Sequence, residues 1–378
     1  MGGRAGVCLR GDEEGTDEEI GERSPVTQKN CRDGLAMGNL AWSSAEMQGW
    51  RESMEDAHLA ISCLREVVVS QNQAASVDMG WNIGLFGVLD GHGGFQVAKF
   101  CERHLPEAIA SRPSANMGAA MAEAFVEMDQ QLKGAEGLKE LRRLSALAKS
   151  IRIRRQTAEG MGTTAVVCCV GPTTLVVANA GDSRAVLCRR GQAIDLSQDH
   201  KPDVPEERAR IEHAGGWIQP GSVSRVNGDL SLSRALGDLE YKLNDNLPPE
   251  GQIVSAVPEV CSVARHPHDE FLLLACDGVW DVLSSQQAVD FVRAQLGDRS
   301  SWATRLASGQ LRGSEILGRL LDRCLSPNLA STAGLGGDNM TAVLVLFLPQ
   351  WGGCGYTPHW CANPHQVHLR ALRLLEAN

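Results

Sequence analysis

The chain has 378 residues, of which 43% are hydrophobic and 22% charged, and its formal charge at pH 7 is −10. The composition is typical of an ordinary soluble globular protein, and the length fits one large sandwich or α/β unit plus tails. The negative charge argues against nucleic acid as the main partner. No apolar run approaches the ~20 residues that a membrane-spanning helix requires.

The 12 cysteines include no CxxC pair and no zinc-site spacing. Several of them, including Cys168, Cys169 and Cys276, lie inside apolar runs, where cysteine behaves as a small hydrophobic residue. We therefore interpret them as reduced thiols of a cytoplasmic or nuclear protein.

Residues 1–34 are polar and rich in glycine, with seven acids between Asp12 and Glu22. We predict that they form a disordered acidic tail. The first residues lack the apolar stretch of a signal peptide. Gly2 follows Met1, but residue 6 is glycine rather than serine or threonine, so the pattern does not favour N-myristoylation.

Regular patterns begin near Leu40. In chain order we predict two strands within 42–62, a loop at 65–80, a strand over 81–90, a turn at 91–94, and helices over 95–110 and 115–133. The stretch 139–155 carries six bases after Glu140 and no acid. It is interpreted as a solvated insertion with some helical character, and the alternative is a docking or targeting patch.

In the second half of the chain, strand patterns and helix patterns do not alternate strictly. Strands are predicted at 165–170, 174–180 and 184–191 as an antiparallel meander, and later at 271–276 and 341–348. Helices are predicted at 205–216, 284–296 and 313–325. Strands in runs and helices in pairs indicate an α+β fold, with antiparallel sheets flanked by helices.

Acidic residues stand at or beside the ends of apolar runs that are far apart in the chain. They are Asp90, Asp182, Asp277, Asp281 and Asp338, with a further acidic pair at Glu55 and Asp56. A carboxylate at the mouth of a buried strand is unfavourable unless it is paired or bound to a metal. No comparable set of lysines and arginines stands beside these acids, so we expect them to converge on hard divalent cations.

Seven motifs make the chain resemble a known family. They are GWRESMEDAH, FGVLDGHGG, MGTTA, ANAGDSRAVL, SLSRALGD, LLLACDGVWDVLS and GGDNMTAVLV, in this order between about residues 40 and 348. The chain resembles the metal-dependent type 2C serine/threonine protein phosphatases. The resemblance implies a central β-sandwich of two antiparallel sheets with helices on both outer faces, a four-layer αββα arrangement. It also implies a flap, formed here by residues 201–234, beside the active site.

The resemblance further implies two Mg²⁺ or Mn²⁺ ions, with Asp90 shared between them. The other positions it assigns are Glu55 and the Gly91 carbonyl on one ion, Asp277 and Asp338 on the other, and Asp56 through bound water. Asp182 and Asp281 match acids of a third, weaker metal position.

Two further side chains carry the chemistry that the resemblance implies. Arg51, four residues before Glu55, would hold phosphate oxygens with its guanidinium fork. His92 would protonate the leaving alkoxide. Asn339 would support the site. The implied reaction is hydrolysis of phosphoserine or phosphothreonine in proteins by attack of a metal-bridging water, without a covalent phosphoenzyme.

Other phosphatase chemistries do not fit the chain: none of the cysteines is followed by arginine at the sixth position, and neither GDxHG nor GNHE occurs. The alternative function is a catalytically weak regulator or scaffold of the same fold that binds phosphoproteins. We predict a monomer with a catalytic domain at 35–350 and an extension at 351–378. The extension contains histidines and cysteines, but their spacing fits no standard zinc site.

Overall fold

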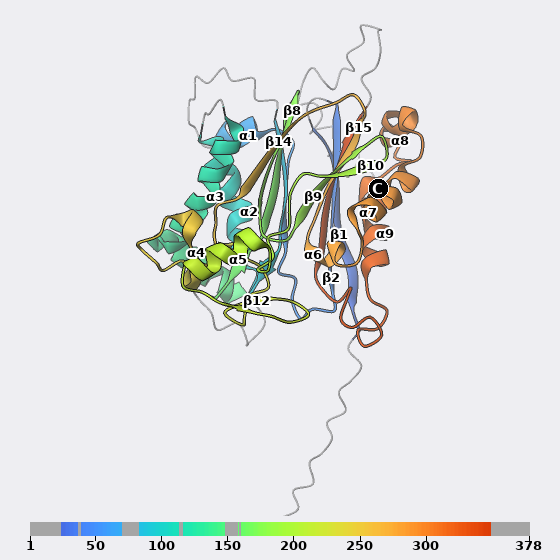
Figure 1. Ribbon diagram of the computed structural model, residues 1–378. Helices are drawn as coiled ribbons and strands as arrows, with labels where there is room; N and C mark the ends of the chain where they lie inside the picture. The colour runs from blue at the N-terminus through green and yellow to red at the C-terminus, as the bar shows by residue number, and fades with distance from the viewer. Residues whose placement is uncertain are drawn as a thin grey trace, which may run out of the picture.

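The computed structural model describes residues 24–36, 39–69, 83–112, 116–147, 158 and 160–348. Figure 1 shows two sheets face to face, with helices covering the outer face of each. This four-layer arrangement is the α+β sandwich that the motif pattern predicts. None of the helices in the described ranges is both long and apolar enough to cross a membrane.

One sheet has five antiparallel strands in the order β14-β8-β7-β4-β3. Their bounds are β3 Ala57–Ile61, β4 Gly84–Leu89, β7 Ala165–Val170, β8 Thr174–Ala180 and β14 Glu259–Ala264. The central strands are buried along their length because the second sheet covers one face and helices cover the other. This explains why they appear in the sequence as continuous apolar runs.

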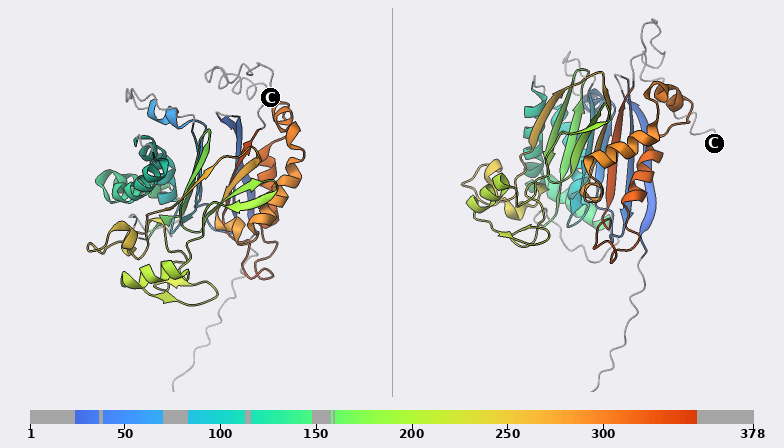
Figure 2. Two further views of the ribbon diagram at one scale, coloured as in Figure 1. Left: turned by 45° about the horizontal axis from the view of Figure 1, so that its top comes forward. Right: turned by 45° about the vertical axis from the view of Figure 1, so that its right-hand side comes forward.

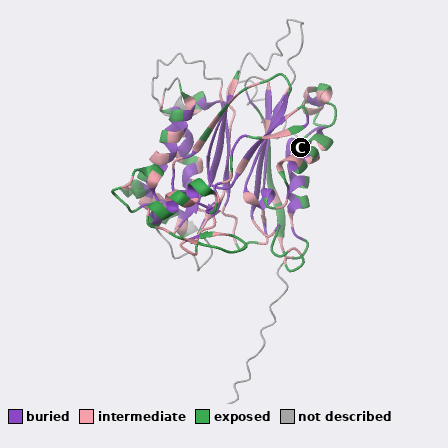
Figure 3. Ribbon diagram, viewed as in Figure 1, coloured by how far each residue is buried: buried purple, intermediate pink, exposed green. Residues whose placement is uncertain are grey.

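The other sheet has six antiparallel strands in the order β1-β2-β16-β15-β9-β10. Their bounds are β1 Val26–Ala36, β2 Leu40–Gly49, β9 Arg184–Arg189, β10 Gln192–Asp195, β15 Asp269–Ala275 and β16 Met340–Phe347. Side chains such as Phe86, Leu187 and Val345 fill the layer between the two sheets. Figure 3 shows this layer and the inner helix faces as buried.

The helices form the two outer layers, as the left view of Figure 2 shows. Over the five-stranded sheet lie α1 Leu64–Val69, α2 Gln96–Ala110, α3 Met117–Lys133 and α4 Ala135–Leu147. Over the six-stranded sheet lie α6 Asp277–Trp280, α7 Ser285–Leu296, α8 Trp302–Ala307 and α9 Gly313–Cys324. Ser284 begins α7 with a capping box that includes Gln287, which confirms the predicted start of this helix.

Smaller elements lie beside the sandwich. The flap (residues 201–234) contains α5 Pro205–His213 and the hairpin of β11 Ile218–Gln219 with β12 Arg225–Val226. A three-stranded sheet has the order β13-β6-β5, with β5 Gly91–His92, β6 Gly162–Thr163 and β13 Leu236–Gly237. The 3₁₀ helices are η1 Leu239–Tyr241, η2 Pro249–Gly251 and η3 Arg299–Ser301.

The predicted tail 1–34 ends too late, because β1 begins at Val26 and pairs with β2. This edge strand is polar and mostly exposed, so its composition resembles that of a tail. It is held by Asp33, which accepts hydrogen bonds from the Ser314 backbone N–H at 3.0 Å and the Ser43 hydroxyl at 2.6 Å. Residues 1–23, including Gly2, and the extension 351–378 lie outside the described residues.

Two further expectations are wrong. The predicted meander holds for β7 and β8, which pair antiparallel, but it is wrong for β9, which crosses to the other sheet and pairs with β15. Strands β8 and β9 are both apolar on both faces, so their pattern does not identify their partners. The predicted loop 65–80 is partly helical, because residues 65–69 belong to α1. Its residues 70–80 lie outside the described ranges. In the basic stretch 139–155, residues up to Leu147 belong to α4.

Candidate active site

The acidic strand ends meet at one end of the sandwich. Antiparallel pairing places the start of β3, the end of β4 and the end of β8 at the same end of the five-stranded sheet. The end of β15 and the start of β16 likewise lie together in the other sheet. A hydrogen bond of 2.7 Å from the Thr341 hydroxyl, in β16, to Oδ2 of Asp56, just before β3, joins the two groups.

Asp56 is a deeply enclosed carboxylate of this region, with 2% of the residue exposed. Burial raises its pKa to about 7, and the negative charge of Asp338 adds to the effect, while the hydrogen bond from Thr341 opposes it. Oδ1 of Asp56 is buried and has no hydrogen-bond partner in the described part of the chain. A buried carboxylate oxygen without a partner is expected to accept a strong donor or a cation.

Asp90 follows β4, and Asp277 follows β15 by two residues. Burial raises the pKa of Asp90 well above its usual range, and the charges of Asp56 and Asp277 raise it further. Burial likewise raises the pKa of Asp277, with contributions from Asp182 and Asp338. Neighbouring carboxylates therefore lie close enough to Asp56, Asp90 and Asp277 to disfavour the ionised forms of these three. Perturbed pKa values of this kind are typical of functional sites.

Glu55 is held by backbone and side-chain donors. Its Oε2 accepts a hydrogen bond of 3.0 Å from the Gly94 N–H, and its Oε1 accepts one of 2.8 Å from the Ser53 hydroxyl. The Glu55 N–H donates to Oδ1 of Asn339 at 2.9 Å. The amide of Asn339 in turn donates to the carbonyls of Gln48 and Ser53 at 2.8 and 2.9 Å. Asn339 thus fixes the loop that carries Glu55.

Gly91 lies where two backbones approach closely. A Cβ atom at this position would be only 2.3 Å from the carbonyl oxygen of Glu55. Any side chain would therefore push apart the segments that carry Asp90 and Glu55. Gly91 therefore lies at the close approach between the segments that carry these two acids.

Two cations already pair with the acidic group, although the sequence shows no comparable set of lysines and arginines beside it. Arg51 Nη2 lies 2.6 Å from Asp338 Oδ2, and Lys201 Nζ lies 2.5 Å from Asp182 Oδ2. Burial lowers the pKa of Lys201, but Asp182, Asp277 and other acids more than offset this and raise it. The sequence contained no signal for Lys201, because its partner is identified only by the tertiary fold.

Asp281 ends helix α6 and does not cap the following helix, whose cap is Ser284. Burial raises the pKa of Asp281, Lys201 opposes the shift, and Asp182 adds to it. The structure therefore places Asp281 within electrostatic reach of Asp182 and Lys201.

His92 forms a carboxylate pair that sequence reasoning missed. Its Nε2 lies 2.7 Å from Oδ2 of Asp238, a residue only 2% exposed. Burial lowers the pKa of His92, but the charge and hydrogen bond of Asp238 outweigh this effect and raise it. Asp238 is the last residue of the SLSRALGD motif, but no spacing in the sequence links it to His92, 146 positions away.

The donors present fit a hard divalent cation. Within the described ranges no three His, Cys, Asp or Glu side chains are arranged as a closed metal-binding group, and several carboxylates instead contact Arg51, Lys201 and Thr341. The unpartnered Oδ1 of Asp56 and the pKa of Asp90, raised by burial and by four neighbouring aspartates, nevertheless mark an excess of negative oxygen donors. Mg²⁺ and Mn²⁺ prefer such donors.

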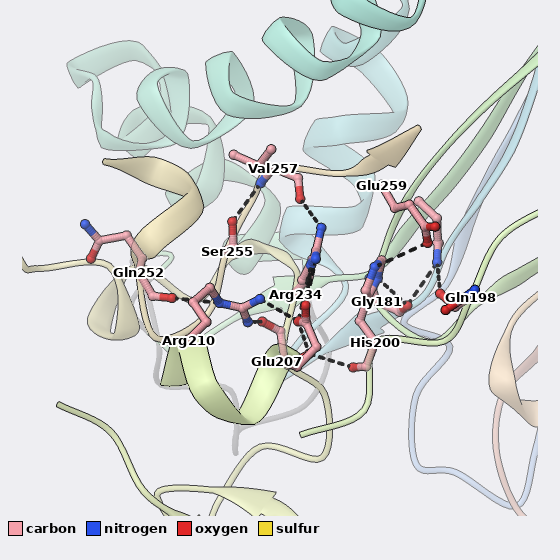
Figure 4. A network of polar contacts seen from close by, with 12 residues as sticks. Gly181, Gln198, His200, Glu207, Arg210, Arg234, Gln252, Ser255, Val257 and Glu259 are labelled. Atoms are coloured by element: carbon pink, nitrogen blue, oxygen red, sulfur yellow. Dashed lines mark hydrogen bonds and ion pairs between the residues drawn. The ribbon is translucent and has the colours of Figure 1, made fainter. Parts of the chain in front are cut away.

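A buried ionic network anchors the flap beside this end of the sandwich (Figure 4). The Glu207 carboxylate, on α5, accepts hydrogen bonds from Arg210 and Arg234, each 2.6 Å at its shortest, and from the Ser233 hydroxyl. Burial alone would raise the pKa of Glu207, but Arg234 and Arg210 lower it to about 2.

Backbone hydrogen bonds extend from this network toward Asp182. The Ser233 backbone N–H donates to the carbonyl of His200, and the His200 backbone N–H donates to the carbonyl of Gly181. The network therefore connects the flap to the loop that carries Asp182.

Comparison with known proteins identifies the family. The family described as "Protein phosphatase 2C" matches residues 40–330. "Probable protein phosphatase 2C 60" of Arabidopsis thaliana is 39% identical over 358 residues, covering 86% of this chain and 90% of that protein. "Protein phosphatase 2C homolog 2" of Schizosaccharomyces pombe is 43% identical over 312 residues, covering 82% and 73%. The chain belongs to the protein phosphatase 2C family, the metal-dependent serine/threonine protein phosphatases that its motifs resemble.

The fold agrees with this assignment. The crystal structure of a phosphatase from a pathogenic strain of Toxoplasma gondii aligns with a TM-score of 0.61 at 24% identity, covering 85% of this chain and 96% of that one. A serine-threonine phosphatase 2C from Toxoplasma gondii aligns with a TM-score of 0.58 at 19% identity, covering 84% and 99%. These similarities confirm the sandwich architecture.

Proposed function

We propose that this chain hydrolyses phosphoserine and phosphothreonine esters in proteins by direct attack of water, without a covalent phosphoenzyme. The observation that carries the proposal is the convergence of Asp56, Asp90, Asp182, Asp277 and Asp338 at one end of the sandwich, where neighbouring charges add to burial in raising the pKa of Asp56, Asp90 and Asp277. Buried carboxylates crowded in this way require a strong positive charge to stay ionised. A phosphate ester hydrolase requires the same positive charge to neutralise its substrate.

The proposed ligands belong to two Mg²⁺ or Mn²⁺ ions. Asp90 would be a ligand of both ions. Glu55 and the Gly91 carbonyl would bind one ion, and Asp277 and Asp338 would bind the other. Asp56 would act through bound water. Asp182 and Asp281 would form a third, weaker position. When bound, the ions would supply an activated water and neutralise phosphate charge.

Two side chains would handle the substrate directly. Arg51 is 61% exposed at its side chain, so its guanidinium can reach a phosphate group at the protein surface. It would exchange its contact with Asp338 for two phosphate oxygens. His92 would deliver a proton to the departing serine or threonine oxygen. We further propose that the enzyme acts as a monomer.

The test compares phosphothreonine and phosphotyrosine peptides as substrates of the purified full chain. We expect phosphate release from the phosphothreonine peptide with Mg²⁺ or Mn²⁺, its loss with EDTA, and recovery on adding metal. Calorimetric titration with Mn²⁺ should show two ions per chain. Metal binding without turnover of any phosphopeptide would instead support the scaffold function, and turnover that resists EDTA would overturn the metal proposal.

A further inference from the structure

The three-stranded sheet β13-β6-β5 brings His92 and Asp238 together. Gly162, in β6, is opposite His92 of β5 on one side and opposite Gly237 of β13 on the other. Asp238 comes directly after β13, so its side chain reaches across to the His92 ring, with Oδ2 2.7 Å from Nε2. The Asp238 side chain is 3% exposed and that of His92 is 27% exposed. The carboxylate is thus hidden behind an imidazole that retains access to solvent.

The glycine between them makes this contact possible. A Cβ atom on Gly162 would lie 2.1 Å from Asp238 Oδ2 and 2.5 Å from His92 Nε2. Alanine at this position would therefore occupy the place of the hydrogen bond itself. The imidazole and the carboxylate meet in a space that only glycine leaves open.

The backbone of Asp238 is also held in an unusual conformation. Its φ of 47° lies in the left-handed region, which residues other than glycine adopt uncommonly. Its N–H donates to the Met161 carbonyl at 2.9 Å. The conformation therefore persists because neighbouring contacts enforce it.

A buried ion pair braces the same segment from helix α3. Asp129 accepts a hydrogen bond of 2.8 Å from the Gly237 N–H with one oxygen and contacts Lys242 Nζ at 2.6 Å with the other. Lys242 also donates to the Ala235 carbonyl at 2.7 Å. The residues on both sides of Asp238 are therefore fixed to the helical layer, and the position of its carboxylate is set by the fold rather than by a mobile loop.

We propose that Asp238 is the positioning residue of His92. Its carboxylate accepts the Nε2–H of the imidazole, which orients the ring and assigns the neutral form to the Nε2–H tautomer. Nδ1 is then the atom that exchanges a proton with the substrate. This inference rests on the proposed acid role of His92.

The proton balance follows from that geometry. As the oxygen of water bonds to phosphorus, the bond from phosphorus to the serine or threonine oxygen breaks, and that oxygen takes the proton from Nδ1. His92 donates as the imidazolium, and its second proton stays on Nε2 in the hydrogen bond to Asp238, so the ring is left neutral as the Nε2–H tautomer. The attacking water releases its proton to solvent, and solvent reprotonates Nδ1. Loss of Asp238 would leave the ring able to rotate and to adopt the other tautomer.

The kinetic test compares Asp238→Ala, Asp238→Asn and His92→Ala on a phosphothreonine peptide and on p-nitrophenyl phosphate, whose leaving group needs little protonation. We expect Asp238→Ala to slow the peptide at least about tenfold, within the roughly 10²–10⁴-fold that general acid catalysis supplies, with a smaller effect on p-nitrophenyl phosphate. Asn can still accept from Nε2–H, so it should recover part of the rate. The Asp238→Ala/His92→Ala double variant should be no slower on the peptide than His92→Ala.

The matched control is Glu140→Ala. Glu140 accepts a similar bond from His104 Nε2 at 2.8 Å, between α4 and α2. Loss of the Glu140 carboxylate should leave the rates on both substrates unchanged. An equal loss on both substrates for Asp238→Ala, or an additive loss in the double variant, would show that Asp238 acts only on folding and would overturn the inference.

A spectroscopic measurement tests the pairing without activity. Long-range ¹H–¹⁵N spectra of the wild-type protein at alkaline pH should show neutral His92 as the Nε2–H tautomer, and finding the Nδ1–H tautomer would overturn the inference. If Asp238→Ala does not fold, the tautomer spectra and the kinetics of Asp238→Asn still test the inference. If His92→Ala slows both substrates equally, the acid role proposed for His92 fails, while the tautomer still reports on Asp238.

Discussion

Lys201 Nζ contacts Asp182 Oδ2 at 2.5 Å, and this ion pair places a fixed positive charge among the converging carboxylates. The Asp182 side chain is 3% exposed and that of Lys201 is 32% exposed. Lys201 stands at the root of the flap, next to His200, whose backbone N–H donates to Gly181. Two consecutive residues of the flap root therefore hold the loop that carries Asp182.

Replacing Lys201 with Met should destabilise the metal-free protein. Removing one partner of a buried ion pair costs roughly 3–5 kcal/mol, and we expect about 2–3 here because Lys201 is partly exposed. Thermal and urea unfolding in EDTA measure the loss. Lys201→Arg, which keeps the charge, is the control. Because Mn²⁺ can replace the missing charge, it should raise the midpoint of Lys201→Met more than that of wild type, and an equal rise would contradict this interpretation.

The stability of the metal-free protein should fall as pH rises from about 4 to 7. The pKa of Asp56 in the folded state is raised to about 7, and those of Asp90 and Asp277 are raised as well. The folded state therefore holds protons that the unfolded state releases at lower pH, and each further rise in pH favours unfolding. For Asp56 alone the effect is on the order of 4 kcal/mol at about 1.4 kcal/mol per pKa unit.

Thermal unfolding between pH 5 and pH 8 in EDTA checks this sign. Asp56→Asn should flatten the profile because it removes one of the titrating groups, whereas Asp245→Asn, at an exposed site, should not. Excess Mg²⁺ or Mn²⁺ should reverse the trend, since cation binding requires ionised carboxylates. A metal-free midpoint that rises over the same pH range would show that the acids do not crowd one another.

Asp90→Asn should separate stability from activity. The substitution removes the charge that Asp56 and Asp277 oppose, so the metal-free variant should unfold at an equal or higher temperature than wild type. Phosphate release should fall by at least about 10³-fold, because metal assistance supplies several kcal/mol of the barrier reduction. Calorimetry should show weaker Mn²⁺ binding. Near-normal turnover would refute the shared position of Asp90.

Two N-terminal deletions should differ sharply. Removing residues 1–23 should leave the unfolding temperature and the rate on p-nitrophenyl phosphate unchanged. Removing residues 1–36 also removes β1, its pairing with β2 and the Asp33 bonds to Ser43 and Ser314. We expect the midpoint to fall by about 5 °C or more, which corresponds to at least roughly 2 kcal/mol in a large domain. Equal midpoints for the two proteins would show that β1 contributes little.

The sequence alone predicted the central strands and most of the helices. Continuous apolar runs such as 165–170 and 271–276 are the signature of strands covered on both faces, and Ser284 marked a helix start. The seven motifs also identified the family and the acids that meet at the site. These features are local: each depends on residues within a few positions of one another.

Only the tertiary structure decided which distant segments meet. Strand β9 joined the opposite sheet from β8, the polar residues 26–36 became an edge strand, and Lys201 and Asp238 proved to be the partners of Asp182 and His92. The physical reason is that sheet membership, edge pairing and counter-ions depend on the register and packing of strands far apart in the chain. A hydrophobic pattern states that a residue is buried, but it does not state against which neighbour.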